Sequence, residues 1–353
     1  MRMRTTMINQ MLQWAECVDP GAHRRIKGLR LVTAYGIAAL LGFASSSRNM
    51  PGATLGFLAG NIALWASFLE VRATRFESTR DLLLLCFAAT VGAFSMIGAS
   101  LCLRGADASG PEVVIATGAF LVGYLNRFGA IGKGIGTQIF LGQIFAYACR
   151  LTWADLGMVT VATGIASIAS VLPRLLSGPG EKPVLSRRSV PVAGIFGLSP
   201  ELVMGLQAGS AVVAIAVANH MIGMQESVWA ISACTFVIAG SAPGTADRVR
   251  RRIIGTIVGV PIGLLCMPLI ERYPIMGWIA AAGAMIVYTV ASPERYDIAC
   301  GAVAFALMVT LTASGIRSPL FLIARLWETA IGATVGLILA TVVLPLRPVR
   351  TEA

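Results

Sequence analysis

The sequence predicts an all-α, polytopic membrane protein, and three observations lead to this fold class. Only 13% of the 353 residues are charged and 56% are hydrophobic, whereas about 25% of the residues of a soluble domain are charged. The apolar runs are continuous, as in 81–103 and 332–344, whereas the strands of a membrane barrel alternate apolar and polar residues. Lipid offers backbone groups no hydrogen-bond partner, so continuous apolar runs must cross it as helices.

Twelve apolar segments are predicted to span the bilayer. They are 28–45, 52–69, 81–103, 112–125, 134–149, 153–172, 200–220, 227–241, 253–270, 275–291, 298–313 and 320–344. A spanning helix needs roughly 20 residues. The fourth and eighth segments are shorter than this, so we expect each to be broken, tilted or re-entrant.

The distribution of Lys and Arg predicts the topology. With the N-terminus in the cytoplasm, most of the 28 basic residues fall on the inner side, and every inner segment contains at least one. This is the positive-inside pattern, so we expect a bacterial inner-membrane protein with both termini in the cytoplasm. The net charge of +11 follows from that topology and requires no nucleic-acid partner.

The N-terminal residues lack the apolar core and cleavage site of a signal peptide. Residues 1–27 are therefore predicted to form a cytoplasmic segment. Within it, residues 7–17 are either a short amphipathic helix lying on the membrane or a disordered tail.

The chain is predicted to be a tandem duplication. Similar residues recur at a spacing of 172 positions, which separates Phe57 from Trp229, Arg80 from Arg252, Gly164 from Gly336 and Pro173 from Pro345. Each half has an even number of spans, so the repeats are parallel. We expect a first six-helix half at 28–173, a cytoplasmic linker at 174–197, a second six-helix half at 198–346 and a cytoplasmic tail at 347–353.

Glycines four residues apart mark several helix faces. Gly255, Gly259 and Gly263 form one series, and Gly332 with Gly336 forms another. Small residues at this spacing share one face and let two helix backbones approach closely, so we interpret both faces as packing surfaces. A face that slides during transport would show the same pattern.

Arg325 and Glu328 are candidates for binding substrate or for coupling. They are three residues apart in the last apolar segment, so they share a helix face. Charged groups inside a membrane are costly and tend to mark substrate pathways. In this role, Arg325 attracts an anion and Glu328 positions Arg325 or carries a coupling proton. The alternative is an ion pair at the outer edge, with the span starting near Trp327.

A second group of arginines precedes the ninth segment. Arg248, Arg250, Arg251 and Arg252 either fix the topology and contact anionic lipid or form a cytoplasmic vestibule that concentrates organic anions. Arg252 adjoins the apolar segment and is the best binding candidate of the four. Arg80 occupies the corresponding position in the first half.

Other chemistries have no motif here. The seven cysteines form no C-x-x-C pair and there are only two histidines, so we expect no metal site. The glycines around Lys133 lack the order of a phosphate-binding loop, and no arrangement of nucleophile and base suggests an enzyme. We expect no cofactor.

Two segments resemble signatures of a known family. Arg252-Ile-Ile-Gly255-Thr256 follows a short loop, and Arg325-Leu-Trp-Glu328-Thr329 begins a last span that stops at Pro345. Both are similar to the fusaric acid resistance protein-like superfamily, which includes bacterial aromatic acid exporters and is distantly similar to plant malate transporters. The resemblance covers about 200–345, whereas over 29–173 it is only architectural.

The resemblance implies proton-coupled export of aromatic or other organic acids, beside a periplasmic adaptor protein. It also implies that a duplicated chain acts as a monomer or a small homo-oligomer. The segment 174–197 is too short to be the large soluble domain of many such exporters, and Glu328 replaces the Asp that the family often has.

Three functions remain open at this point. The first is a secondary transporter that exports organic anions, the second is a passive anion channel, and the third is a membrane scaffold without transport activity.

Overall fold

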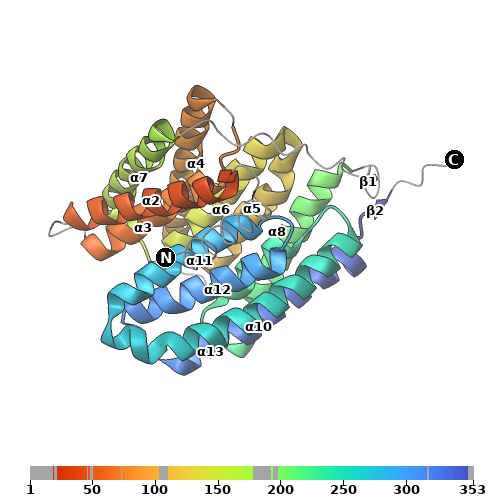
Figure 1. Ribbon diagram of the computed structural model, residues 1–353. Coiled ribbons are helices and arrows are strands. Elements are labelled where there is room, and N and C mark those ends of the chain that lie inside the picture. The colour runs from red at the N-terminus through yellow and green to blue at the C-terminus, as the bar shows by residue number, and fades with distance from the viewer. Residues whose placement is uncertain are drawn as a thin grey trace, which may run out of the picture.

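The computed structural model describes residues 19, 22–45, 47, 51–72, 74–102, 110–177, 192–193, 198–315 and 318–348. The segment predicted as an amphipathic helix or tail, 7–17, lies outside these residues, as does most of the linker. Within them the chain is a bundle of α-helices, shown in Figure 1.

The first half contains α2 (His23–Ala44), α3 (Gly52–Leu69), α4 (Arg75–Cys102), α5 (Gly110–Tyr124), α6 (Gly129–Ala148) and α7 (Leu156–Leu176). The second contains α8 (Pro200–Ile222), α9 (Ser227–Val237), α10 (Ala242–Arg272), α11 (Pro274–Ala291), α12 (Tyr296–Ala313) and α13 (Pro319–Ile338). The 3-10 turns η2 (Leu125–Phe128) and η3 (Trp153–Asp155) precede α6 and α7, and one π-helical turn, η4 (Leu339–Val343), follows α13. Two-residue strands β1 (Val192–Ala193) and β2 (Arg347–Pro348) pair antiparallel.

Each predicted span coincides with one of these helices, which makes the chain a multi-pass membrane protein. By length and composition, ten helical runs of the described residues can cross a bilayer. The difference from twelve has two sources. Helices α5 and α6 are joined by η2 into one apolar run, and α9 is too short to be included. The prediction that the eighth span is short is therefore confirmed.

Serine caps start three helices of the second half. Ser199, Ser241 and Ser318 each accept a hydrogen bond at Oγ from a backbone N–H three residues later, at 3.3, 3.2 and 3.3 Å. A proline follows each serine within two residues, where its fixed φ suits the first helical turn and its missing N–H costs nothing. These local signals set where α8, α10 and α13 begin.

The same helix pairs pack in both halves. Helix α4 contacts α6 and α7 as α10 contacts α12 and α13, α5 contacts α6 as α11 contacts α12, and α3 contacts α7 as α9 contacts α13. Between the halves, α5 packs on α8 and α11 packs on α2. This recurrence is what a duplicated six-helix unit produces.

Contacts among the loops agree with the predicted sidedness. Arg24 in the first turn of α2 pairs with Glu294 in the α11–α12 loop, and Arg251 Nη1 of α10 donates to the Glu294 carbonyl oxygen at 2.9 Å. Strands β1 and β2 join the linker to the C-terminal segment. All of these segments were predicted to be cytoplasmic, and each contact joins two of them; which side of the membrane they face stays a prediction.

The packing role predicted for the glycine faces is visible in their neighbours. A Cβ at Gly255 would lie 2.4 Å from the Asp297 carbonyl oxygen, and one at Gly259 would lie 2.3 Å from that of Gly301, both on α12. A Cβ at Gly263 would lie 2.5 Å from the Met308 Cβ. On α13, Gly332 and Gly336 face the backbone of α9 in the same way. No sequence rule separates these glycines from those that face open space.

Gly332→Ala is expected to destabilise the protein because its Cβ would lie 2.1 Å from the Ala230 carbonyl oxygen. Overpacking of this kind costs about 1–3 kcal/mol. The apparent melting temperature in detergent measures the loss. Gly164→Ala is the control, since a Cβ there meets nothing within 4 Å. Equal melting temperatures for the two variants would contradict the packing role.

Candidate functional site

Helix α9 is interrupted at both ends. It has 11 residues, whereas its counterpart α3 has 18. At 1.5 Å per residue it is about 16 Å long, roughly half the thickness of a bilayer core. Residues 223–226 before it and 238–241 after it are not helical. Non-helical backbone at membrane depth is tolerated only where protein buries it or where it lines a cavity, so this region is where a site is expected.

Side chains from other helices satisfy the backbone at both interruptions. Before α9, Glu328 Oε1 accepts hydrogen bonds from the N–H groups of Gln225 and Glu226 at 2.7 and 3.1 Å. After α9, Arg248 Nη1 donates to the Ile238 carbonyl oxygen at 2.9 Å, and the Thr245 hydroxyl accepts from Ala239 N–H at 3.0 Å. The interruptions are therefore built into the fold.

Glu328 is completely buried, and its Oε2 atom has no hydrogen-bond partner within the described part of the chain. It forms no ion pair with Arg325 there. Helix α13 begins at Pro319, so both residues lie beyond its first turn. An ion pair between the two is therefore not formed among the described residues, whereas the place at which α13 enters the bilayer stays a prediction.

Arg325 is buried without an acidic partner. Its residue is 8% exposed, and its guanidinium makes no hydrogen bond or ion pair to any residue the structure describes. The Trp229 ring on α9 lies close to it, with its centroid 5.6 Å from Arg325 Cζ. A cation over an aromatic face is attracted to it, but the interaction leaves the N–H donors free.

Arg252, which is half-buried on α10, lies within electrostatic range of Arg325. The two guanidinium groups are close enough to repel each other, and both interact electrostatically with the Cys300 thiol on α12. Arg252 also interacts with the Tyr296 hydroxyl, while its buried Nε has no partner among the described residues. The arginine pair, Arg252 and Arg325, therefore concentrates positive charge inside the second half.

The structure separates the other predicted arginines from this pair. The Arg80 side chain is 65% exposed and lies next to Asp81, which also pairs with Arg72 at 2.8 Å. Position 80 of the first half is thus more exposed than position 252, which is half-buried. In the predicted vestibule, Arg248 donates a hydrogen bond to the Ile238 carbonyl oxygen, and Arg251 forms an ion pair with Asp247 at 2.8 Å. Arg250 is exposed.

Glu112, which no sequence pattern singled out, is 1% exposed at the start of α5. Its Oε1 accepts hydrogen bonds from Tyr147 OH at 2.6 Å, from Asn219 Nδ2 at 2.7 Å and from Ser227 Oγ at 2.7 Å. These donors come from α6, α8 and α9, so Glu112 joins the two halves beside the start of α9. Its position at a span boundary resembled that of an ordinary surface carboxylate, and only the fold shows the three donors.

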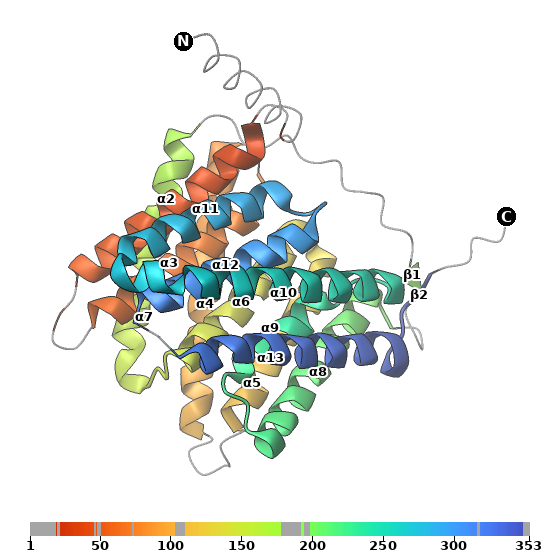
Figure 2. The ribbon, with the colours of Figure 1, turned by 60° about the horizontal axis from the view of Figure 1, so that its bottom comes forward.

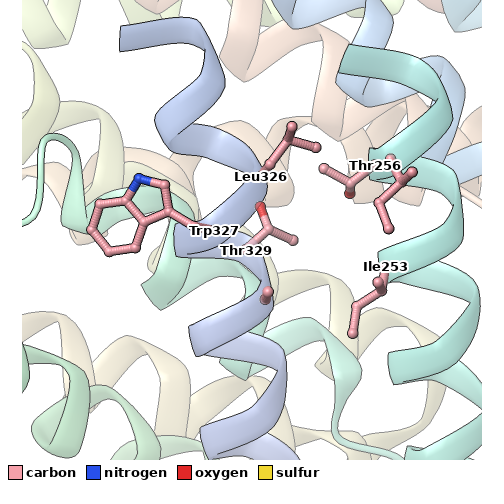
Figure 3. Close-up of a pocket in the computed structure, with 7 residues that line it drawn as sticks. Ile253, Thr256, Leu326, Trp327 and Thr329 are labelled. Carbon is pink, nitrogen blue, oxygen red and sulfur yellow. The ribbon is translucent and has the colours of Figure 1, made fainter. Parts of the chain in front are cut away.

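A cleft separates α10 from α13 at the level of the arginine pair. It has a volume of about 270 Å³ and is lined by Ile253, Thr256, Ile257, Leu326, Trp327, Thr329 and Ala330. Figure 3 shows Leu326 and Thr329 of α13 pointing toward α10, while the Trp327 ring lies on the far side of α13. Arg252 and Arg325 lie one helical turn from Thr256 and Thr329 along their own helices.

The arginine pair, Glu328 and the cleft all fall within one segment that resembles a known family. Residues 211–339 match the fusaric acid resistance protein-like family. The resemblance predicted from the two sequence signatures is therefore confirmed over most of the second half. The family is one of membrane transporter-like proteins, and the match extends from the middle of α8 to the end of α13.

Two other comparisons gave no match. Neither the curated proteins nor the solved structures contain a significant relative of this chain.

Replacement of Glu328 tests its backbone hydrogen bonds. Glu328→Ala leaves the N–H groups of Gln225 and Glu226 without their acceptor, and a buried unsatisfied donor costs about 1–3 kcal/mol. Glu328→Gln keeps an acceptor oxygen, so it is expected to lose less. The apparent melting temperature in detergent should fall in the order wild type, Gln, Ala. An unchanged melting temperature for the Ala variant would contradict this role.

Glu226, in the loop between α8 and α9, is expected to make the stability of the protein depend on pH. Burial raises the pKa of this carboxyl above its ordinary value of 4.5, and Arg150 opposes the rise. The folded protein therefore binds its proton more tightly than the unfolded chain does. The contribution of Glu226 to stability should decline as pH rises from about 4.5 through the raised pKa. Melting temperatures of wild type and Glu226→Gln over this range should diverge, whereas parallel curves would contradict the expectation.

Proposed function

We propose that the protein is a secondary transporter that exports organic acids and binds their carboxylate at the arginine pair. The observation that carries this proposal is that Arg325 is buried and Arg252 is half-buried within electrostatic range of it, while neither forms an ion pair with an acidic residue that the structure describes. Burying a charge is costly unless it is paired and hydrogen-bonded. A carboxylate supplies both a counter-charge and acceptors for free guanidinium N–H donors.

The charge of the site favours a monoanion. The arginine pair carries two positive charges. Glu328 carries one negative charge when ionised, and it interacts electrostatically with Arg325. The excess is one positive charge, which one carboxylate offsets. A dianion would leave the site negative.

The direction and the coupling of transport follow from the surroundings of the pair. Arg248 and Arg250 lie four and two residues before Arg252 in α10, on the side predicted to be cytoplasmic. They can attract anions from that side. Glu328 is the proposed proton carrier, because its Oε2 is buried and unpartnered while Oε1 holds the α8–α9 loop. A periplasmic adaptor beside a bacterial inner-membrane exporter belongs to the same proposal.

Uptake of radiolabelled benzoate into inverted membrane vesicles tests the function. We expect accumulation that depends on a pH gradient. Arg252→Ala and Arg325→Ala should each reduce it about tenfold or more, since a charged hydrogen bond contributes about 1.5–3 kcal/mol. Arg272→Ala is the control because it removes an exposed arginine at the far end of α10.

The outcomes separate the candidate functions. Wild-type uptake by both variants, at equal membrane levels, would refute the binding role of the arginine pair. Uptake that ignores the pH gradient and follows the anion's own gradient would indicate a channel. No uptake of benzoate, propionate or succinate by the wild type would favour a scaffold.

A further inference from the structure

The cleft between α10 and α13 contains a polar group with no partner. Thr329 lines it, is 2% exposed, and has a hydroxyl without a hydrogen-bond partner among the residues described. Thr256 faces it from α10 but donates its own hydroxyl to the Arg252 carbonyl oxygen at 2.9 Å. Most of the buried threonines in these helices make a similar bond to their own backbone, as Thr235, Thr312 and Thr137 do. Thr329 is the exception, so its hydroxyl is available to a ligand.

The rest of the cleft is apolar. Ile253 and Ile257 form the α10 side, and Leu326 and Ala330 form the α13 side. Ile257 is 57% exposed, which places the mouth of the cleft toward the bilayer, while Thr256 and Thr329 are nearly buried at its inner wall. The cleft is thus apolar at its mouth and has one free hydroxyl at its depth.

The size of the cleft limits what it can hold. Its volume is about 270 Å³, and a cavity of roughly 150 Å³ is enough for benzene. One six-membered ring with a small substituent therefore fits, whereas two fused rings with a substituent would fill or exceed the space.

The cleft lies between the level of Arg252 on α10 and the level of Arg325 on α13. Helices α10 and α13 lie side by side in Figures 1 and 2 and run antiparallel, since Val249 of α10 packs near Ala333 of α13 and Val260 packs near Leu322. Arg252 and Arg325 are each one turn, about 5.4 Å, from the threonine of their own helix, and they therefore flank the two threonines from opposite ends of the cleft. This separation is comparable to the distance between the carboxyl group of a single-ring acid and the opposite edge of its ring.

We propose that the α10–α13 cleft is the subsite for the apolar body of the transported acid, with Thr329 as the residue that hydrogen-bonds a polar substituent on it. This inference rests on the proposed function. The subsite restricts substrates to acids of one ring, and Thr329 selects among those by their ring substituents.

Two variants test the subsite in the vesicle assay. Thr329→Val removes the hydroxyl with little change of shape. It should raise the half-saturating concentration for 4-aminobenzoate about two- to tenfold, which is the worth of one neutral hydrogen bond, and leave that for benzoate unchanged. Ala330→Phe fills the cleft and should abolish uptake of both ring acids. Leu265→Phe is its control, because Leu265 is 81% exposed on α10 and does not line the cleft.

Benzoate and 2-naphthoate, as competitors of 4-aminobenzoate uptake, test the size limit. Benzoate should compete and 2-naphthoate should not. Equal effects of Thr329→Val on 4-aminobenzoate and benzoate, together with wild-type uptake by Ala330→Phe, would overturn the subsite and leave the cleft to a lipid chain. Failure of the proposed function looks different, since the wild type would then take up neither acid.

Discussion

Two guanidinium groups cannot be buried together in a low-dielectric interior without an anion to offset their charge. Arg325 is buried and Arg252 is half-buried, both within electrostatic range of the Cys300 thiol on α12, and neither forms an ion pair with an acidic residue of the described chain. Other buried charges of the described chain are paired, as Arg174 is with Glu70 and Asp81 is with Arg72. In the proposed function, a bound anion offsets this charge and stabilises the second half.

The interruption of α9 makes room for this arrangement. A continuous helix at this position, like α3, satisfies its own backbone and needs no help from α13 or α10. The shortened α9 instead needs Glu328 at one end and Arg248 with Thr245 at the other. Trp229 on α9 then faces Arg325 from within the interrupted segment. The first half thus has a continuous helix, α3, at the position where the second half has the short helix α9 beside the candidate site.

Much of the fold could be predicted from the sequence because lipid leaves so few options. Twelve continuous apolar segments, the serine and proline residues that start α8, α10 and α13, and the alternation of basic loops are all local signals. The pairing of Gly255 with Asp297, or of Gly332 with Ala230, is not local, because it depends on which helices meet. Boundaries also shifted, since α7 runs through Pro173 to Leu176. A proline there is tolerated within the last turns of the helix.

The site was only partly predictable for the same reason. Arg252, Arg325 and Glu328 were recognisable because a charge inside an apolar run has few explanations. Arg80 had the same sequence position in its repeat, but the fold exposes it and Asp81 lies beside it. Glu112 carried no sequence signal, because a carboxylate at a span boundary is common, and Thr329 stood in a family signature without any sign of a role for its hydroxyl. Their importance comes from what the tertiary structure places, or fails to place, next to them.

The most direct measurement is the position of a bound acid. An experimental structure with 4-iodobenzoate, phased on the anomalous signal of iodine, would locate the carboxylate and the ring together. Density for the carboxylate between Arg252 and Arg325, with the iodine peak in the cleft between α10 and α13, is the predicted result. An iodine peak elsewhere in the bundle, with the arginine pair unoccupied at saturating concentration, would contradict the assignment of these arginines as the anion site.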